Sequence, residues 1–109
     1  MSILRYSYPT LIKRSKSLSY RQQVTSMTTV LMNFLVEHKL IVIEPFHENG
    51  SLKDDLVLRS SDLTDLGNEF FKVVFPKWSA YIDRGGDIQN TTVLLKGLEK
   101  LQIQQLNRL

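Results

Sequence analysis

The sequence predicts a mostly helical α+β fold in which a two-stranded hairpin interrupts a series of helices. Two long segments, residues 20–38 and 62–83, place apolar residues at the three- and four-residue spacing of amphipathic helices. Between them lie a β-branched run and an Asn49-Gly50 pair, the strongest short-range turn signal in the chain. Because 109 residues suffice for one core, we expect residues 1–109 to form a single domain.

The amino-terminal region predicts two helices. Pro9 fits the first turn of a helix, where its missing N–H has no intrahelical partner in any case, and it predicts a short helix over residues 10–16. A longer helix is predicted over residues 20–38, with Thr25 or Ser26 as an N-cap if a turn divides it. The apolar stripe of this helix consists of Met27, Val30, Leu31, Phe34 and Leu35.

A β-hairpin is predicted next. Residues 40–43 are rich in β-branched side chains, and Pro45 limits the length of this first strand. Residues 56–58 are predicted to be the return strand, with Asn49-Gly50 in the loop between the two strands. We therefore expect residues 40–43 and 56–58 to pair in an antiparallel sheet.

The helix after the hairpin begins at Asp62 or Thr64, since either side chain can accept a hydrogen bond from a free N–H of the first turn. Pro76 is expected to kink this helix, because proline lacks the donor that the helical ladder needs. Gly85-Gly86 is expected to end it.

A last, additional helix is predicted over about residues 88–108. Its leucines are expected to share one side, which Gln102 and Gln105 interrupt. The leucines are Leu94, Leu95, Leu98, Leu101, Leu106 and Leu109. Because buried amides need hydrogen-bond partners, this side either belongs to the core or pairs with its copy in a homodimer.

Charge is strongly segregated along the chain. The first 36 residues contain five cations and no acidic residue, whereas residues 37–70 contain eight acids against three cations. The net charge of +3 conceals this separation. Such segregation affects partners and association rates. The basic segment is either a nucleic-acid-binding surface or an ordinary solvated face.

Composition narrows the functional classes. The chain has no cysteine, which excludes disulfides and thiolate chemistry, and its apolar runs are far shorter than a membrane span requires. No secretory signal is visible near Arg5, so we expect a cytoplasmic protein. His38 and His47 lack partners at metal-ligand spacing. We therefore expect no catalytic residues, no metal and no cofactor, and the protein is not predicted to be an enzyme.

Two motifs carry a resemblance to a known family. Residues 30–41, VLMNFLVEHKLI, resemble the end of a recognition helix that enters a β-hairpin. Residues 63–67, LTDLG, follow the return strand with the pattern Leu-Thr-x-x-Gly. In this order and at this distance, the motifs are similar to those of the winged-helix family of DNA-binding domains. The resemblance covers about residues 25–75.

This resemblance implies a small, non-catalytic, DNA-binding regulator of transcription that dimerises through its terminal helix. Its recognition helix would turn Thr25 and Ser26 toward the major groove of duplex DNA, together with the side chains expected to contact base edges, namely Thr28, Thr29 and Asn33. No Arg or Lys lies between Gln22 and His38. Phosphate contacts are therefore expected from Lys13, Arg14, Lys16 and Arg21.

A second interpretation makes the protein a protein-interaction module on the same scaffold, such as an adaptor subunit, an antitoxin or an immunity protein. The acidic loop of the expected hairpin would then dock a basic protein partner, because charge complementarity speeds encounter. The side chains expected in this role are Glu48, Asp54 and Asp55. On a DNA-binding surface the same carboxylates would repel phosphates unless they pointed away.

Overall fold

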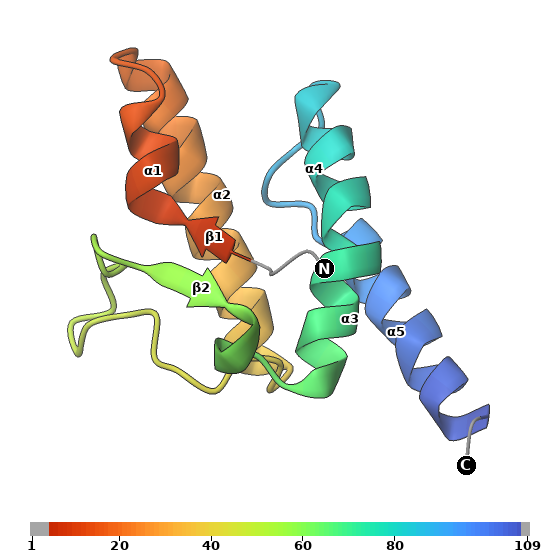
Figure 1. Cartoon of the computed structure of the whole chain (residues 1–109). Helices are drawn as coiled ribbons and strands as arrows, with labels where there is room; N and C mark the ends of the chain where they lie inside the picture. Colours follow the sequence, from red (N-terminus) through yellow and green to blue (C-terminus); the bar gives the residue numbers. More distant parts are fainter. Residues whose placement is uncertain (1–4, 108–109) are drawn as a thin grey trace. The chain divides into compact units, whose positions relative to one another are not determined.

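The computed structural model describes residues 5–107 and confirms a mostly helical α+β composition with a two-stranded antiparallel sheet. The chain forms two compact units, Met1–Thr64 (unit 1) and Asp65–Leu109 (unit 2), where the sequence predicted one domain. The elements in Figure 1 are β1 (Arg5–Ser7), α1 (Tyr8–Lys13), α2 (Leu18–Glu37), β2 (Val57–Arg59), the 3-10 turn η1 (Ser60–Asp62), α3 (Asp65–Val73), α4 (Phe75–Asp83) and α5 (Thr92–Asn107).

Two packed helices form one side of unit 1. The hydroxyl of Ser7 accepts from the Thr10 N–H at the start of α1, and Pro9 occupies the first turn as predicted. Helix α2 runs without interruption past Thr25 and Ser26, and its N-cap is Ser17, whose hydroxyl accepts from the Tyr20 N–H. The turn between two helices therefore lies at residues 14–17, immediately after α1.

The inner face of α2 joins apolar packing to two hydroxyl pairs. Its buried residues are Val24, Thr28, Leu31, Met32, Phe34 and Leu35. The Tyr6 and Thr28 hydroxyls are 2.7 Å apart, as are those of Tyr8 and Thr25. Each pair satisfies two polar groups that burial would otherwise leave without water. These pairs attach β1 and α1 to the middle of α2.

The carboxyl end of α2 closes with two further hydrogen bonds. The Lys39 N–H donates to the Val36 carbonyl at 3.2 Å, and the Leu40 N–H donates to the Leu35 carbonyl at 2.9 Å. This pattern needs a left-handed residue just past the helix, and Lys39 adopts φ +57°. The fully buried Leu40 then starts the chain back along unit 1.

The pairing predicted for the sheet is wrong in one strand. β2 (Val57–Arg59) overlaps the expected return segment, residues 56–58, but its partner is β1, in the antiparallel register Arg5–Arg59, Tyr6–Leu58 and Ser7–Val57. Residues 40–46 form only isolated bridges, Ile41 with Leu63 and Phe46 with Leu52. β1 can occupy the edge of β2 because α1 and the two tyrosine hydroxyls hold it there.

The turn signal at Asn49-Gly50 is confirmed. Gly50 adopts φ +86°, and the His47 N–H donates to the Ser51 carbonyl at 2.8 Å across the turn. The Asn49 side-chain oxygen accepts from both the N–H and the hydroxyl of Ser51. Residues 40–63 therefore double back as expected, but as an irregular loop and not as a regular hairpin.

Unit 2 consists of helices α3, α4 and α5, which pack on one another (Figure 1). The kink expected at Pro76 is a complete break, since α3 ends at Val73 and Pro76 lies in the first turn of α4. The Gly85 N–H donates to the Ile82 carbonyl and the Gly86 N–H to the Tyr81 carbonyl, so the glycines end α4 as predicted.

The leucines of α5 do not share one side. Leu94, Leu98 and Leu101 are buried, whereas Leu95 and Leu106 are exposed, and Leu109 lies outside the described residues. Gly97 permits the close approach of α5, because a Cβ there would lie 2.5 Å from a methyl carbon of Val74. Within residues 5–107, no helix combines the length and apolar content required to cross a membrane.

Candidate nucleic-acid interface

Four predicted phosphate-binding residues gather where α1 turns into α2. Lys13 ends α1, Arg14 is its C-cap, Lys16 lies in the connection, and Arg21 follows in the first turns of α2. All four side chains are exposed. We refer to these four residues as the cationic turn; Arg5 lies in β1 and is not part of it.

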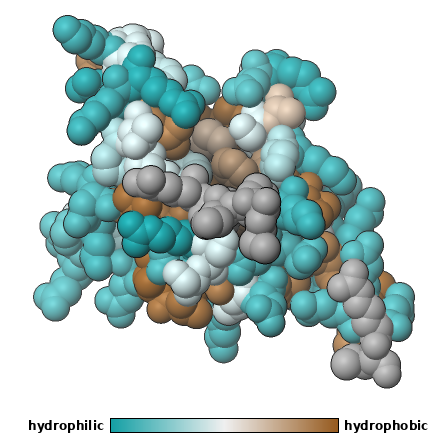
Figure 2. Space-filling view, viewed as in Figure 1, coloured by the Kyte–Doolittle hydropathy of each residue, from teal (hydrophilic) through white to brown (hydrophobic). Residues whose placement is uncertain are grey.

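The charges of the cationic turn are available to a ligand. None of the four is paired with a carboxylate within the described part of the chain, and the Nε–H of Arg21 donates to the Ser15 carbonyl at 3.1 Å. No acidic residue occurs before Glu37. In Figure 2, hydrophilic residues cover the end of unit 1 where α1 meets α2, at the upper left.

The start of α2 carries charges opposite to those that would stabilise the helix. Its first turn has no acidic residue and its last turn has no basic one. Cations lie near its start and Glu37 is its final residue. Since a helix start carries partial positive charge, the cations make the start of α2 electrostatically unfavourable, whereas at its end Glu37 is followed closely by the exposed Lys39. An anionic ligand at the cationic turn would relieve the unfavourable charge at the start.

Thr28 does not fit the predicted role of a base-contacting residue. Its side chain is fully buried, at 0% exposure, and its hydroxyl is paired with that of Tyr6. The resemblance to the winged-helix family misplaced it, and its residue type gave no warning, because a threonine is compatible with either face of an amphipathic helix. Thr28 faces the core of unit 1, and its prediction as a contact to DNA is wrong.

The other two predicted base-contacting residues differ from each other. Thr29 is half-buried, and its hydroxyl donates to the Thr25 carbonyl one turn earlier at 2.8 Å. Its proton is therefore used inside the helix, although its oxygen can still accept. Asn33 is exposed, so its carboxamide can reach a ligand.

The exposed face of α2 adds a residue that was not among the predicted contacts. Gln22 and Ser26 are exposed and share a line with Thr29 and Asn33 at the spacing i, i+4, i+7 and i+11. We name these four residues the polar stripe. The signal for Gln22 was present in the sequence, because Gln22 lies eleven residues before Asn33 and thus three helical turns away on the same face.

The acidic residues of the alternative interpretation lie elsewhere in unit 1. Glu48 is exposed beside the Asn49-Gly50 turn, and Asp54 and Asp55 are exposed in the turn before β2. The loop that carries them extends beside β2, away from the turn between α1 and α2 (Figure 1). The charge segregation of the sequence is therefore also a separation in space within unit 1.

The acidic loop borders an open surface depression lined by Val36, Lys39 and residues 41–48. Val36 and Val42, at 47% and 63% exposure, are apolar residues of its lining, and Glu44 and Glu48 are acidic ones. Unit 1 thus has two chemically different exposed surfaces: a cationic and polar one along the start of α2, and an apolar and acidic one after its end.

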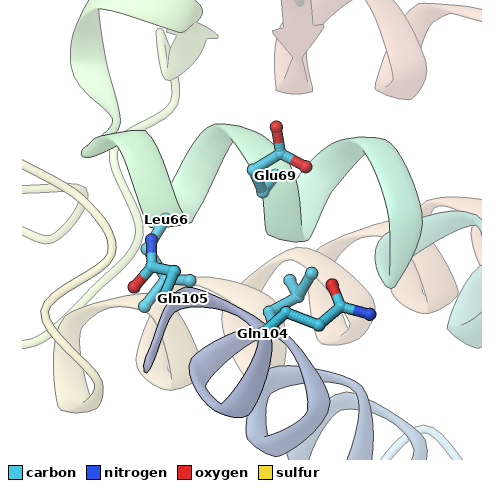
Figure 3. A pocket seen from close by; sticks show the side chains of 5 residues that line it. Leu66, Glu69, Gln104 and Gln105 are labelled. Atoms are coloured by element: carbon cyan, nitrogen blue, oxygen red, sulfur yellow. The ribbon is translucent and has the colours of Figure 1, made fainter. Parts of the chain in front are cut away.

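The pocket between α3 and α5 is too small for a small-molecule ligand. The pocket in Figure 3 lies between α3 and α5, is lined by Leu66, Glu69, Leu101, Gln104 and Gln105, and has a volume of about 20 Å³. That volume holds about one water molecule, whereas small-molecule sites usually measure hundreds of Å³. Among residues 5–107, no cluster of three histidine or acidic side chains could hold a metal ion.

Comparison with known proteins adds no relative. The chain matches no protein-family model, no curated protein and no solved structure. Function must therefore be inferred from the surfaces of the chain itself.

Proposed function

We propose that this protein is a small, non-catalytic, duplex-DNA-binding protein of winged-helix type that acts in transcription regulation. The observation that carries the proposal is the cationic turn: four exposed cations without a carboxylate partner in the described chain, in a segment that contains no acidic residue before Glu37. Contacts of Lys and Arg with phosphates dominate the affinity of proteins for DNA. Clustered, unpaired cations favour such a ligand over a merely solvated face.

In the proposed complex, the start of α2 enters the major groove and the cationic turn contacts the flanking phosphate backbone. A B-DNA major groove is about 12 Å wide and accommodates an α-helix. The exposed polar stripe follows the cations along α2, so phosphate contacts and base contacts would come from adjacent parts of one helix. Phosphates near the start of α2 would also offset its unfavourable charge.

The order of elements in unit 1 supports the winged-helix part of the proposal. A strand, two helices joined by a four-residue connection and a doubled-back segment that returns as β2 follow one another. Residues 40–63 would act as the wing. Their acidic turns extend away from the cationic turn, which lessens repulsion of a DNA backbone bound there.

The proposal is tested by the salt dependence of DNA affinity. If four cations neutralise four phosphates, the plot of log affinity against log salt concentration has a slope on the order of −3 to −4. Substituting Arg14, Lys16 and Arg21 by Ala should reduce the slope to about −1. Fluorescence anisotropy with a random-sequence duplex measures both values.

A matched control separates the cationic turn from net charge. Lys72, Lys96 and Lys100 are exposed in unit 2, and their triple Ala variant loses the same three charges. This variant should retain most of the wild-type slope. Equal slopes for the two triple variants, or no binding of duplex DNA at about 0.05 M salt, would refute the proposal.

The apolar and acidic surface supports a second candidate function, docking of a basic protein partner. Such a partner would place apolar side chains against Val36 and Val42 and cations near Glu48, Asp54 and Asp55. Reversing Asp54 and Asp55 to Lys should then abolish capture of the partner from a cell extract. Undiminished capture by this variant would refute the second candidate.

A further inference from the structure

The polar stripe of α2 has a chemistry of its own. Its exposed members are two carboxamides, Gln22 and Asn33, and one hydroxyl, Ser26. Neither carboxamide is hydrogen-bonded to another residue in the region 5–107. Each therefore offers a free donor and a free acceptor side by side.

This pair of groups matches one base better than the others. In the major groove, adenine presents the N7 acceptor next to the N6 donor, which a carboxamide satisfies with two hydrogen bonds. Guanine presents two acceptors, which are best matched by Arg or Lys, and the cytosine amino group is best matched by a carboxylate. After Arg21, α2 contains no cation, and its first carboxylate is Glu37, at the far end of the helix.

Methyl groups on the same surface of α2 also favour an A·T pair. Thr29, a member of the stripe, and its neighbour Val30 are half-buried, so methyl groups are partly exposed there. The thymine methyl group is the apolar feature of an A·T pair in the major groove. Carboxamides for adenine and methyl groups for thymine thus occur on the same surface of α2.

We propose that the polar stripe selects adenine, so that the protein prefers A·T-containing duplex sites, with Gln22 as the principal specificity-determining residue. This inference rests on the proposed function. Gln22 directly follows Arg21 and lies near the start of α2, the part of a recognition helix that reaches base edges. Asn33 lies about 16 Å further along the helix and makes a secondary contact.

The experiment starts with a random duplex library, from which the protein enriches its preferred sequence. Each adenine of that sequence is then replaced, one at a time, by 7-deazaadenine, which pairs normally but lacks the N7 acceptor. Losing the N7 hydrogen bond of one bidentate contact should weaken wild-type binding by roughly two- to tenfold at one adenine. For Gln22→Ala, the same replacement should have no effect.

Three controls separate a loss of adenine recognition from a general loss of DNA binding or of folding. Gln102→Ala shortens an exposed carboxamide of α5 and should bind both duplexes as the wild type does. Gln22→Ala should leave the salt slope unchanged, because glutamine contacts no phosphate in the proposed complex. Circular dichroism verifies that each variant is folded.

Two results would overturn the inference while leaving the proposed function intact. One is salt-dependent binding of random duplex DNA without enrichment of any adenine-containing sequence. The other is a 7-deazaadenine penalty that is as large in Gln22→Ala as in the wild type. The absence of binding to any duplex at low salt would instead refute the proposed function, and the inference with it.

Discussion

The hydroxyl pair of Tyr6 and Thr28 accounts for the inward position of Thr28, which was predicted to contact base edges. The pair of Tyr8 and Thr25 does the same for Thr25, which was expected to face the groove. The oxygens of Tyr6 and Thr28 are 2.7 Å apart, and Thr28 is fully buried. A buried hydroxyl that loses its partner costs about 1–3 kcal/mol, more than the hydrogen bond itself contributes. The pair therefore constrains β1 against α2 and leaves the outer face of α2 to other side chains.

Tyr6→Phe should lower the free energy of unfolding by about 1–3 kcal/mol, because it leaves the Thr28 hydroxyl buried without this partner. Adding Thr28→Val should recover part of the loss by removing the orphaned hydroxyl. Urea unfolding of the two single variants and the double variant measures the coupling. Additive losses would show that the two hydroxyls do not interact.

The same pair predicts a dependence on alkaline pH. Burial raises the pKa of Tyr6 above its usual value, and the hydrogen bond from Thr28 offsets part of this rise. Because the unfolded state then loses its proton first, the stability that Tyr6 contributes is complete below pH about 10 and is lost as pH rises through the folded pKa. Tyr6→Phe should flatten the fall in stability between pH 9 and 11, whereas an unchanged fall would contradict this assignment.

At the scale of the element, α2 combines a well-packed inner face with an unfavourable charge at its start. It is a 20-residue helix, about 30 Å long, and six of its residues are buried. Packing on that face compensates for charges that oppose the helix dipole. An unfavourable arrangement of this kind is often retained where it serves binding.

Two substitutions separate the stability of α2 from its proposed ligand. Ser19→Glu places an acid in the first turn and Glu37→Lys places a cation in the last, so each should stabilise the protein by about 0.3–1 kcal/mol. Only Ser19→Glu should weaken DNA binding, because it adds a negative charge beside the cationic turn. Thermal unfolding and anisotropy provide the two readouts.

The comparison is informative because Ser19→Glu should raise stability while it lowers DNA affinity. If Ser19→Glu left DNA affinity unchanged, the start of α2 would not be the interface. If Glu37→Lys weakened binding as much as Ser19→Glu does, the cause would lie in the structure of the helix and not in local charge.

At the scale of the whole molecule, α5 has exposed apolar residues that could form the interface of the expected homodimer. Ile103 and Leu106, at 57% and 69% exposure, leave apolar surface on the side of α5 opposite its buried leucines. Fully burying a side chain of this size contributes about 1.5–3 kcal/mol. We propose that a second copy of the chain covers this surface, as the expected self-association requires.

Ile103→Lys combined with Leu106→Lys should raise the dimer dissociation constant at least about tenfold, since two charges would replace two apolar contacts. Thr92→Lys, at an exposed position near the start of α5, is the control and should leave association unchanged. Sedimentation equilibrium measures the mass of each protein. A wild-type protein that stays monomeric at every concentration would refute the homodimer.

Local chemistry explains which features were predictable. The five helices follow from spacing and from residues such as Pro9 and Gly85, which act through neighbours a few positions away. The cationic turn was predictable for the same reason, because its four residues lie within nine consecutive positions. The sequence also predicted that the helix is interrupted at Pro76, although the interruption is a complete break between α3 and α4 and not the expected kink.

The sequence by itself therefore determined the helices, the turn at Asn49-Gly50 and the separation of charge. Only the tertiary structure decided which segment pairs with β2 and which polar residues of α2 face outward. Both depend on contacts between residues far apart in the chain: Arg5–Ser7 occupies the edge of β2, and the Tyr6 hydroxyl draws Thr28 inward. Residue spacing does not specify such partners, because the free energy of a long-range contact depends on everything else that is buried with it.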